Sequence, residues 1–246
     1  MIKFFRHIRK SLLMENKTSK YFKYAIGEII LVVIGILIAL SINNWNQNRL
    51  DKNKSKEYHQ RIAEDLDLLN SILSNESKRA LQMRKYLFAS VQILKSKELT
   101  KKNKDTLDFA LNNFFQMVQI QGSLDTYEEL KSSGQLGLIY NKDLRKQLNQ
   151  YIEALSAFSK IITQLTNQVN KTAPIDKHVT LFIANESSLR KTPLEYDFNL
   201  MKKDKFLINT LSRFSLHWQT KSFFSNNLLE VGESLKKNIQ KELNND

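Results

Sequence analysis

Residues 25–42 read AIGEIILVVIGILIALSI and contain a single charged side chain, Glu28. At about 1.5 Å of rise per residue, a helix of this length extends roughly 27 Å, close to the hydrocarbon thickness of a bilayer. Aromatic residues typical of membrane interfaces flank the segment, with Tyr21 and Tyr24 before it and Trp45 after it. The stretch therefore predicts a transmembrane helix, which separates a short tail from a long polar remainder.

The composition of the polar remainder favours long helices. The chain of 246 residues contains 6 Gly and 2 Pro, so turns are few, and Leu, Lys, Asn, Gln, Glu and Ser are abundant. It contains no Cys, which excludes disulfides, thiolate metal sites and cysteine nucleophiles. We expect an all-α fold, with one N-terminal transmembrane helix followed by an antiparallel bundle of long helices.

The basic residues are concentrated before the apolar segment. Residues 1–24 contain seven Lys or Arg and one Glu, and their spacing predicts a basic amphipathic tail on the cytoplasmic face. Four basic residues also follow the segment between Arg49 and Lys56, so the charge difference is modest. The positive-inside rule predicts a cytoplasmic N-terminus, with the polar domain on the opposite side.

A cleavable signal peptide is the alternative interpretation of the same segment. Ala39-Leu40-Ser41 resembles the small residues of a cleavage site. The long basic region and the long apolar core favour a retained signal-anchor over cleavage.

Beyond the apolar segment, residues 43–60 are almost wholly polar and form either a tether or, more in keeping with their composition, a continuing helix. Apolar residues at helical spacing then predict four main helices with smaller ones between them. The main helices cover about residues 62–96, 105–119, 141–173 and 204–243, and a short helix is expected at about 175–184.

Two of these apolar patterns are interrupted. Glu76 and Ser90 break the pattern of the first helix, and the pattern of the last helix shifts near residues 221–225. We expect a bend or a change of packing partner at the second position.

The N-terminal run MIKFFRHIRKSLLMENKTSKYFKYAIGEIILVVIGILIALSINNWNQ resembles an uncharacterised single-pass membrane family, a domain of unknown function of Gram-negative, Bacteroidota-type bacteria. The likeness covers about the first 50 residues, and the segment TYEELKSSG at 126–134 is similar to the central part of that family. The resemblance implies an inner-membrane anchor with a periplasmic helical domain, and it implies no activity. Together with the residue patterns above, this predicts four regions: 1–24 a basic amphipathic cytoplasmic tail, 25–42 the transmembrane helix, 43–60 a polar juxtamembrane helix or tether, and 61–246 a periplasmic helical bundle.

Within the apolar segment, Glu28 is the first candidate site. A carboxylate in a membrane span is costly, so it indicates a proton-carrying or partner-binding group, or else a shallow group that reaches interfacial water or pairs with Lys20 or Lys23. Gly35 and Ala39 form a small-x-x-x-small pair that allows two helices to approach closely, although such pairs also arise by chance.

The segment around residues 126–140 is the second candidate. Tyr127, Glu128, Leu130 and Gly134 are expected either to form an interaction patch or simply to end a helix at a glycine. We do not favour one of these interpretations over the other.

No residues stand out as catalytic, cofactor-binding or metal-binding. The four His are far apart, and the paired carboxylates adjoin in sequence and so face different sides of a helix. The net charge of +13 is not accompanied by a nucleic-acid-binding motif. We therefore expect no enzyme, no cofactor, no nucleic-acid partner and no identifiable small-molecule substrate.

The sequence is best interpreted as a membrane-anchored structural or protein-interaction module whose partners are the bilayer and a second protein or further copies of this chain. One alternative is a subunit of a membrane assembly that uses Glu28 for proton or ion coupling. Another is a helical bundle that senses a ligand in a cavity between its helices.

Overall fold

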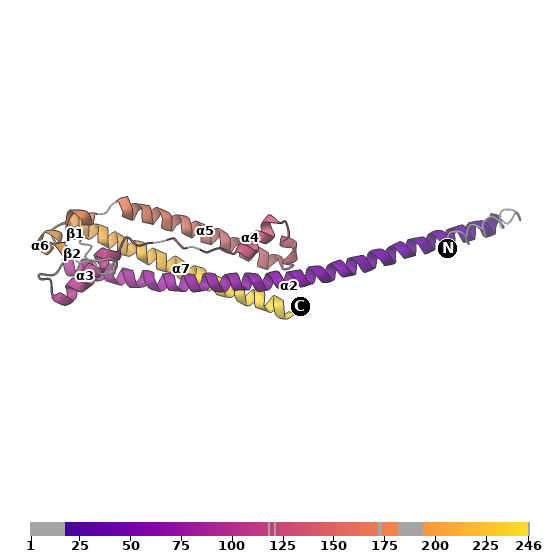
Figure 1. The fold of residues 1–246 in the computed structure, drawn as a ribbon, viewed down its shortest axis with the longest axis horizontal. Helices are drawn as coiled ribbons and strands as arrows, with labels where there is room; N and C mark the ends of the chain where they lie inside the picture. Colours follow the sequence, from indigo (N-terminus) through magenta and orange to yellow (C-terminus); the bar gives the residue numbers. More distant parts are fainter. Residues whose placement is uncertain (1–17, 118, 121, 172–173, 182–193, 246) are drawn as a thin grey trace. The chain divides into compact units, whose positions relative to one another are not determined.

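The computed structural model describes residues 18–117, 119–120, 122–171, 174–181 and 194–245, most of which are helical (Figure 1). This agrees with the expected all-α class. The described elements are α2 (Thr18–Leu94), α3 (Lys101–Asn113), α4 (Asp125–Ser132), η1 (Leu136–Leu138), α5 (Lys142–Lys171), η2 (Pro174–Lys177), β1 (Val179–Leu181), β2 (Leu194–Tyr196), α6 (Phe198–Met201) and α7 (Lys205–Asn245). The chain divides into two units, residues 1–55 and 56–246, which we describe separately.

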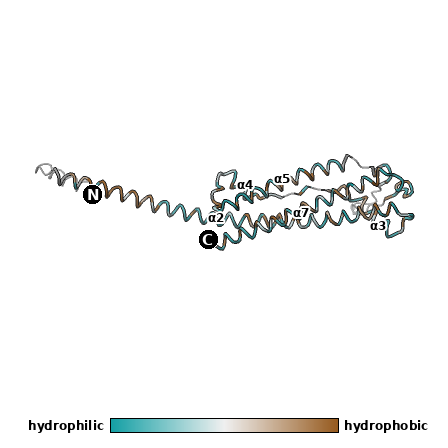
Figure 2. The backbone as a smooth tube through the Cα atoms, turned by 180° about the vertical axis from the view of Figure 1, so that it is seen from behind, coloured by the Kyte–Doolittle hydropathy of each residue, from teal (hydrophilic) through white to brown (hydrophobic). Residues whose placement is uncertain are grey.

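In the N-terminal unit, the apolar segment 25–42 is helical and belongs to α2. Its aliphatic side chains are solvent-exposed, and none of the 18-residue apolar window is buried by the rest of the chain. Figure 2 shows this run of hydrophobic residues along the first part of α2. Residues 43–60, for which a tether or a helix was expected, are also helical.

In the C-terminal unit, the apolar patterns predicted from sequence form one core. The pattern from Ile62 to Leu87 on α2 is buried, as are most of the apolar positions from Leu144 to Ile162 on α5 and from Leu207 to Ile239 on α7. The core therefore lies between the three long helices, and burial of these side chains is its main source of stability.

Contacts along the helices establish their directions. Asn141 bonds Glu242 and Gln147 bonds Asn238, so α5 and α7 are antiparallel. Ion pairing of Asp67 with Lys236 and contact of Ser77 with Ser222 show that α2 and α7 are also antiparallel. It follows that α2 and α5 run in the same direction, which differs from a fully antiparallel arrangement (Figure 1).

The reason is the connection between α3 and α4, which is not helical. The predicted helix at 105–119 begins earlier, at Lys101, and ends at Asn113. Residues 114–117, 119–120 and 122–124, here called the strap, then return along the long helices in an extended path (Figure 1). Phe114, Met117, Ile120 and Leu124 of the strap are buried in the core, whereas Val118, part of the predicted helix, lies outside the described residues.

Side chains from all three long helices bond to carbonyl oxygens of the strap. Trp218 Nε1 of α7 donates to the Phe114 carbonyl at 3.1 Å, and an Arg79 guanidinium nitrogen of α2 donates to that of Gln116 at 3.0 Å. Thr166 Oγ1 of α5 donates to the Met117 carbonyl at 3.0 Å. These bonds give three carbonyl groups of the strap side-chain donors in place of the backbone donors of a helix.

The short helix expected at about 175–184 is wrong at residues 179–181. Residues 174–177 form the 3₁₀-helix η2, and β1 then pairs antiparallel with β2, with Val179 opposite Tyr196 and Leu181 opposite Leu194. Residues 182–184 lie outside the described part of the chain. A three-residue segment is too short to show a period that separates strand from helix, and its partner strand lies outside it in the sequence.

At the start of α7, the Asp204 carboxylate bonds both to the helix N-terminus and to His178. Its Oδ1 accepts bonds from the backbone N–H groups of Phe206 and Leu207, which caps the helix, and its Oδ2 lies 2.7 Å from His178 Nε2. The contact with His178 and the capping bonds lower the pKa of the Asp204 carboxyl to about 2. This residue therefore joins α7 to the segment between η2 and β1.

Glu76, one of the interruptions on α2, meets the interrupted part of α7 in space, whereas Ser90 Oγ donates to the Tyr86 carbonyl of its own helix. Glu76 on α2 pairs with Lys221 on α7, and Ser77 Oγ lies 3.1 Å from Ser222 Oγ. We call these four residues the polar layer. The Lys221 side chain is 0% exposed and that of Glu76 is 18% exposed. Burial lowers the pKa of Lys221, and Glu76 opposes that shift.

Replacement of the two members of the buried pair should have unequal effects. Glu76→Ala leaves a buried ammonium without its carboxylate and should lower the free energy of unfolding by about 3–5 kcal/mol. Lys221→Met should cost less, under about 2 kcal/mol, because water reaches the Glu76 carboxylate. Chemical denaturation of the full chain in detergent, followed by circular dichroism, measures both values.

The exposed pair Asp67–Lys236 provides the matched control, since Asp67→Ala should cost at most about 1 kcal/mol. The double variant E76L/K221M should restore most of the stability lost in E76A. Equal losses for E76A and K221M would contradict this account of the polar layer.

Candidate functional site at the junction of α4 and α2

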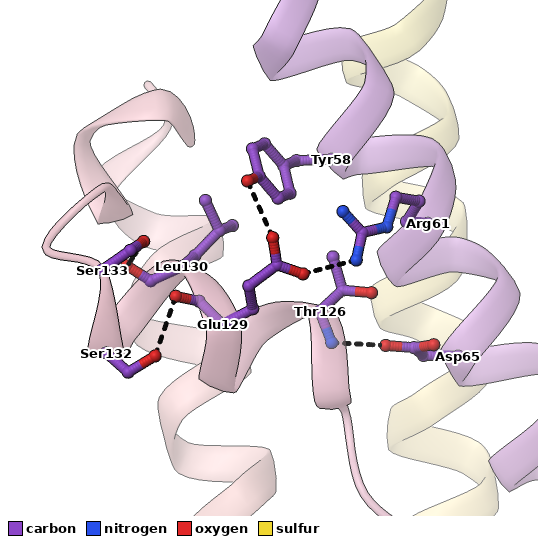
Figure 3. Close-up of polar contacts among 8 residues, drawn as sticks. All are labelled: Tyr58, Arg61, Asp65, Thr126, Glu129, Leu130, Ser132 and Ser133. Carbon is purple, nitrogen blue, oxygen red and sulfur yellow. Dashed lines mark hydrogen bonds and ion pairs between the residues drawn. The ribbon is translucent and has the colours of Figure 1, made fainter.

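Helix α4 depends on α2 for its N-terminal cap. Its N-cap residue is Leu124, which makes no side-chain capping bond. Instead, Asp65 Oδ2 of α2 accepts a bond of 2.9 Å from the backbone N–H of Thr126 (Figure 3). A carboxylate at this end also interacts favourably with the helix dipole.

A second contact holds the middle of α4 against α2. Glu129 accepts bonds from the Tyr58 hydroxyl at 3.0 Å and from the Arg61 guanidinium at 2.5 Å (Figure 3). The Arg61 guanidinium also lies 5.3 Å from the centre of the Tyr58 ring. These bonds lower the pKa of Glu129 and raise that of Tyr58.

The energetic value of this cluster is small, because its charged groups are partly in water. The side chains of Arg61 and Glu129 are 40% and 46% exposed, and such pairs contribute at most about 1 kcal/mol. The cluster therefore orients α4, whereas the apolar contacts of α4 supply most of the binding energy between the two helices.

Gly134 ends α4 as the sequence predicted. Its φ is +70°, and its backbone N–H donates to the Lys131 carbonyl at 3.3 Å. The N–H of Gln135 donates to the Leu130 carbonyl at 2.9 Å, which completes a Schellman motif. Glycine suits this left-handed position because it has no Cβ.

The four residues of the predicted interaction patch divide into two pairs. Tyr127 and Leu130 are 2% and 0% exposed, so their side chains belong to the core, and burial raises the pKa of Tyr127. Glu128 and Gly134 are exposed. We define the α4 surface as the exposed residues Glu128, Lys131, Ser132, Gly134 and Gln135.

Tyr58, Arg61 and Asp65 were not among the site residues predicted from the sequence. Their spacing of three and four residues places them on one face of α2, next to the buried pattern. That spacing was a usable signal, but nothing in the sequence paired this polar face with Glu129 and Thr126.

The candidates in the apolar segment lie in the other unit. Glu28 is partly exposed, and Gly35 and Ala39 are exposed one turn apart on α2. Trp45 is 64% exposed and lies beneath the Arg49 guanidinium, which is 5.5 Å from its ring centre. The side chains of Tyr21 and Tyr24 lie outside the described part of the structure.

The described part of the chain contains no cluster of metal-ligating side chains. Among those residues, no three His, Asp or Glu side chains gather closely enough to hold a metal ion. The chemistry available at the junction is hydrogen bonding and charge pairing, which suits recognition.

Replacement of Gly134 by Ala should weaken the end of α4. A Cβ at φ +70° costs about 1–2 kcal/mol, although no neighbouring atom lies within 4 Å of its position. Gly137→Ala, also in open space but without a positive φ, should be neutral or stabilising by up to about 1 kcal/mol. Urea denaturation of both variants provides the comparison, and an equal effect of the two would refute the left-handed cap as the cause.

Comparison with known proteins does not assign the chain to a family. No family model matches the sequence, and no curated protein matches it.

Proposed function

We propose that this chain is a single-pass membrane protein whose C-terminal unit is a helical bundle that acts as a structural or protein-interaction module and not as an enzyme. The observation that carries the proposal is the apolar part of α2. Within the described residues it is the one helix long and apolar enough to cross a membrane, and the chain buries none of its apolar window.

Exposure of this surface to water would be unfavourable. Burial of apolar area is worth about 25 cal/mol per Å², and side chains such as Ile29, Leu31 and Leu37 are each more than half exposed. A bilayer covers such a surface on all sides of the helix, whereas a soluble partner would need to enclose it completely. Lipid is therefore the simplest cover.

The direction of insertion follows from charge. Seven basic residues precede the span, so the N-terminus is proposed to be cytoplasmic and the C-terminal unit periplasmic, at the inner membrane of a Gram-negative bacterium. The likeness of the first 50 residues to a single-pass family of such bacteria supports the same assignment.

The α4 surface is the part of the C-terminal unit that we assign to recognition. Helix α4 is held against α2 by the bond from Thr126 to Asp65 and by the bond from Arg61 to Glu129. The buried side chains of Tyr127 and Leu130 fix it further. The opposite side of the helix is then free to present charged and hydroxyl groups beside a glycine turn. Binding residues are often found on such supported loops and short helices.

Membrane anchoring can be tested with arginine substitutions in α2. The double variant I34R/L37R places two charges near the middle of the span, each of which costs about 2.5–3.5 kcal/mol on insertion. The matched variant N46R/N48R adds the same charge to the polar part of α2. After alkaline carbonate extraction, we expect the wild type and N46R/N48R in the membrane pellet and I34R/L37R largely in the supernatant. Soluble wild-type protein would overturn the proposal.

The recognition role can be tested by site-directed cross-linking, because the chain has no native Cys. Ser132→Cys on the α4 surface and Gln240→Cys on α7 are both exposed sites for a maleimide–benzophenone reagent. Illumination of native membranes should give a discrete adduct from S132C and none from Q240C. An adduct of twice the chain mass would identify a second copy as the partner. Absence of any adduct from S132C would contradict recognition by this surface.

A further inference from the structure

A cavity of about 280 Å³ lies between α5 and α7. It is lined by Gln168 of α5 and by Thr210, Arg213, Phe214 and His217 of α7. The cavity lies near the end of α5, whereas α4 precedes the start of that helix. It is therefore separate from the α4 surface, and the proposed function does not use it.

The Arg213 guanidinium and the His217 imidazole line this cavity, and each offers hydrogen-bond donors that have no partner in the described structure. Arg213 and His217 are four residues apart, which places them on the same face of α7. In the described part of the structure, the buried Nδ1 of His217 has no hydrogen-bond partner, and Arg213 makes no ion pair or hydrogen bond. Burial of His217, together with the nearby Arg213 charge, lowers the pKa of its imidazole.

The walls of the cavity carry positive charge only. Residues 154–171 of α5 and 205–229 of α7 contain five Lys or Arg and no Asp or Glu. Two acidic groups that contact α7 or precede it are already engaged, since Glu76 pairs with Lys221, and Asp204 pairs with His178 and Lys177. The charge of Arg213 therefore has no described counter-ion on these elements.

We propose that this cavity binds a small oxyanion, either a carboxylate or a phosphate group, through the Arg213 guanidinium and the Nδ1–H of His217. The planar guanidinium presents paired N–H donors that match two oxygens of such a group. The histidine nitrogen, buried and unpaired, supplies a third donor from the adjacent turn. A water molecule occupies about 30 Å³ in the liquid, so the cavity holds a small anion with room to spare but is smaller than most drug-sized sites.

Titration calorimetry of the full chain in detergent tests this proposal with two probes, inorganic phosphate and succinate, at constant ionic strength in chloride. We expect saturable binding of at least one probe. Arg213→Gln should weaken that binding at least tenfold, because it removes the charge and the paired donors. Arg213→Lys keeps the charge but not the paired donors, so its affinity for the probe should lie between those of the wild type and Arg213→Gln.

The control for net charge is Lys237→Gln, an exposed position on the same helix. This variant should bind within about twofold of the wild type, since its charge is distant from the cavity. Binding of phosphate alone would identify the ligand group as phosphate, and binding of succinate alone would identify it as carboxylate. Absence of binding by either probe at about 10 mM would overturn the proposal.

Nuclear magnetic resonance of the histidine side chains locates the bound anion. The imidazole signals of His217, assigned by their loss in H217Q, should shift as the probe is added and should not shift in R213Q. Because Arg213 is exposed, R213Q should retain the circular dichroism spectrum and unfolding midpoint of the wild type. Binding that is equal in R213Q, or that leaves the His217 signals unchanged, would place the anion elsewhere and refute the site.

Discussion

The fold of the C-terminal unit depends on how the strap satisfies its backbone polar groups. An extended segment within a helical core has no neighbouring strand, so its carbonyl groups need side-chain donors. Trp218, Arg79 and Thr166 supply them, one from each long helix. Because the strap returns the chain without forming a helix, α5 begins at the same end as α2 and runs parallel to it, and α7 becomes the antiparallel partner of both.

The same requirement explains why the two candidate sites differ. At the junction of α4 and α2, the carboxylates of Asp65 and Glu129 accept bonds from a helix N-terminus, Tyr58 and Arg61. Such satisfied contacts position a helix and leave its outer side for recognition. In the cavity between α5 and α7, a guanidinium and a buried imidazole nitrogen have no described partner, and this is a reason to seek an external ligand.

Much of the helical structure could be predicted from local sequence. The helix predicted at about 141–173 corresponds to α5, and Asn141 Oδ1 caps it by accepting bonds from the backbone N–H groups of Asp143 and Leu144. Gly134 likewise ended α4 as expected. These signals are local, because helix period and capping depend on residues within a few positions of one another. The apolar run from 25 to 42 is local in the same sense.

Contacts between distant residues decided the rest. The helix predicted to Gln119 ends at Asn113 because Trp218 and Arg79 bond to the strap, and β1 exists because residues 194–196 pair with it. The breaks at Glu76 and near Lys221 were visible in sequence as two separate irregularities, but only the packing of α2 against α7 made them one ion pair. The sequence by itself determined most of the helical segments and the segment that could span a bilayer, since those properties arise from neighbouring residues. The tertiary structure decided helix direction, the docking of α4 and the cavity at Arg213, since each requires groups that are far apart in the chain.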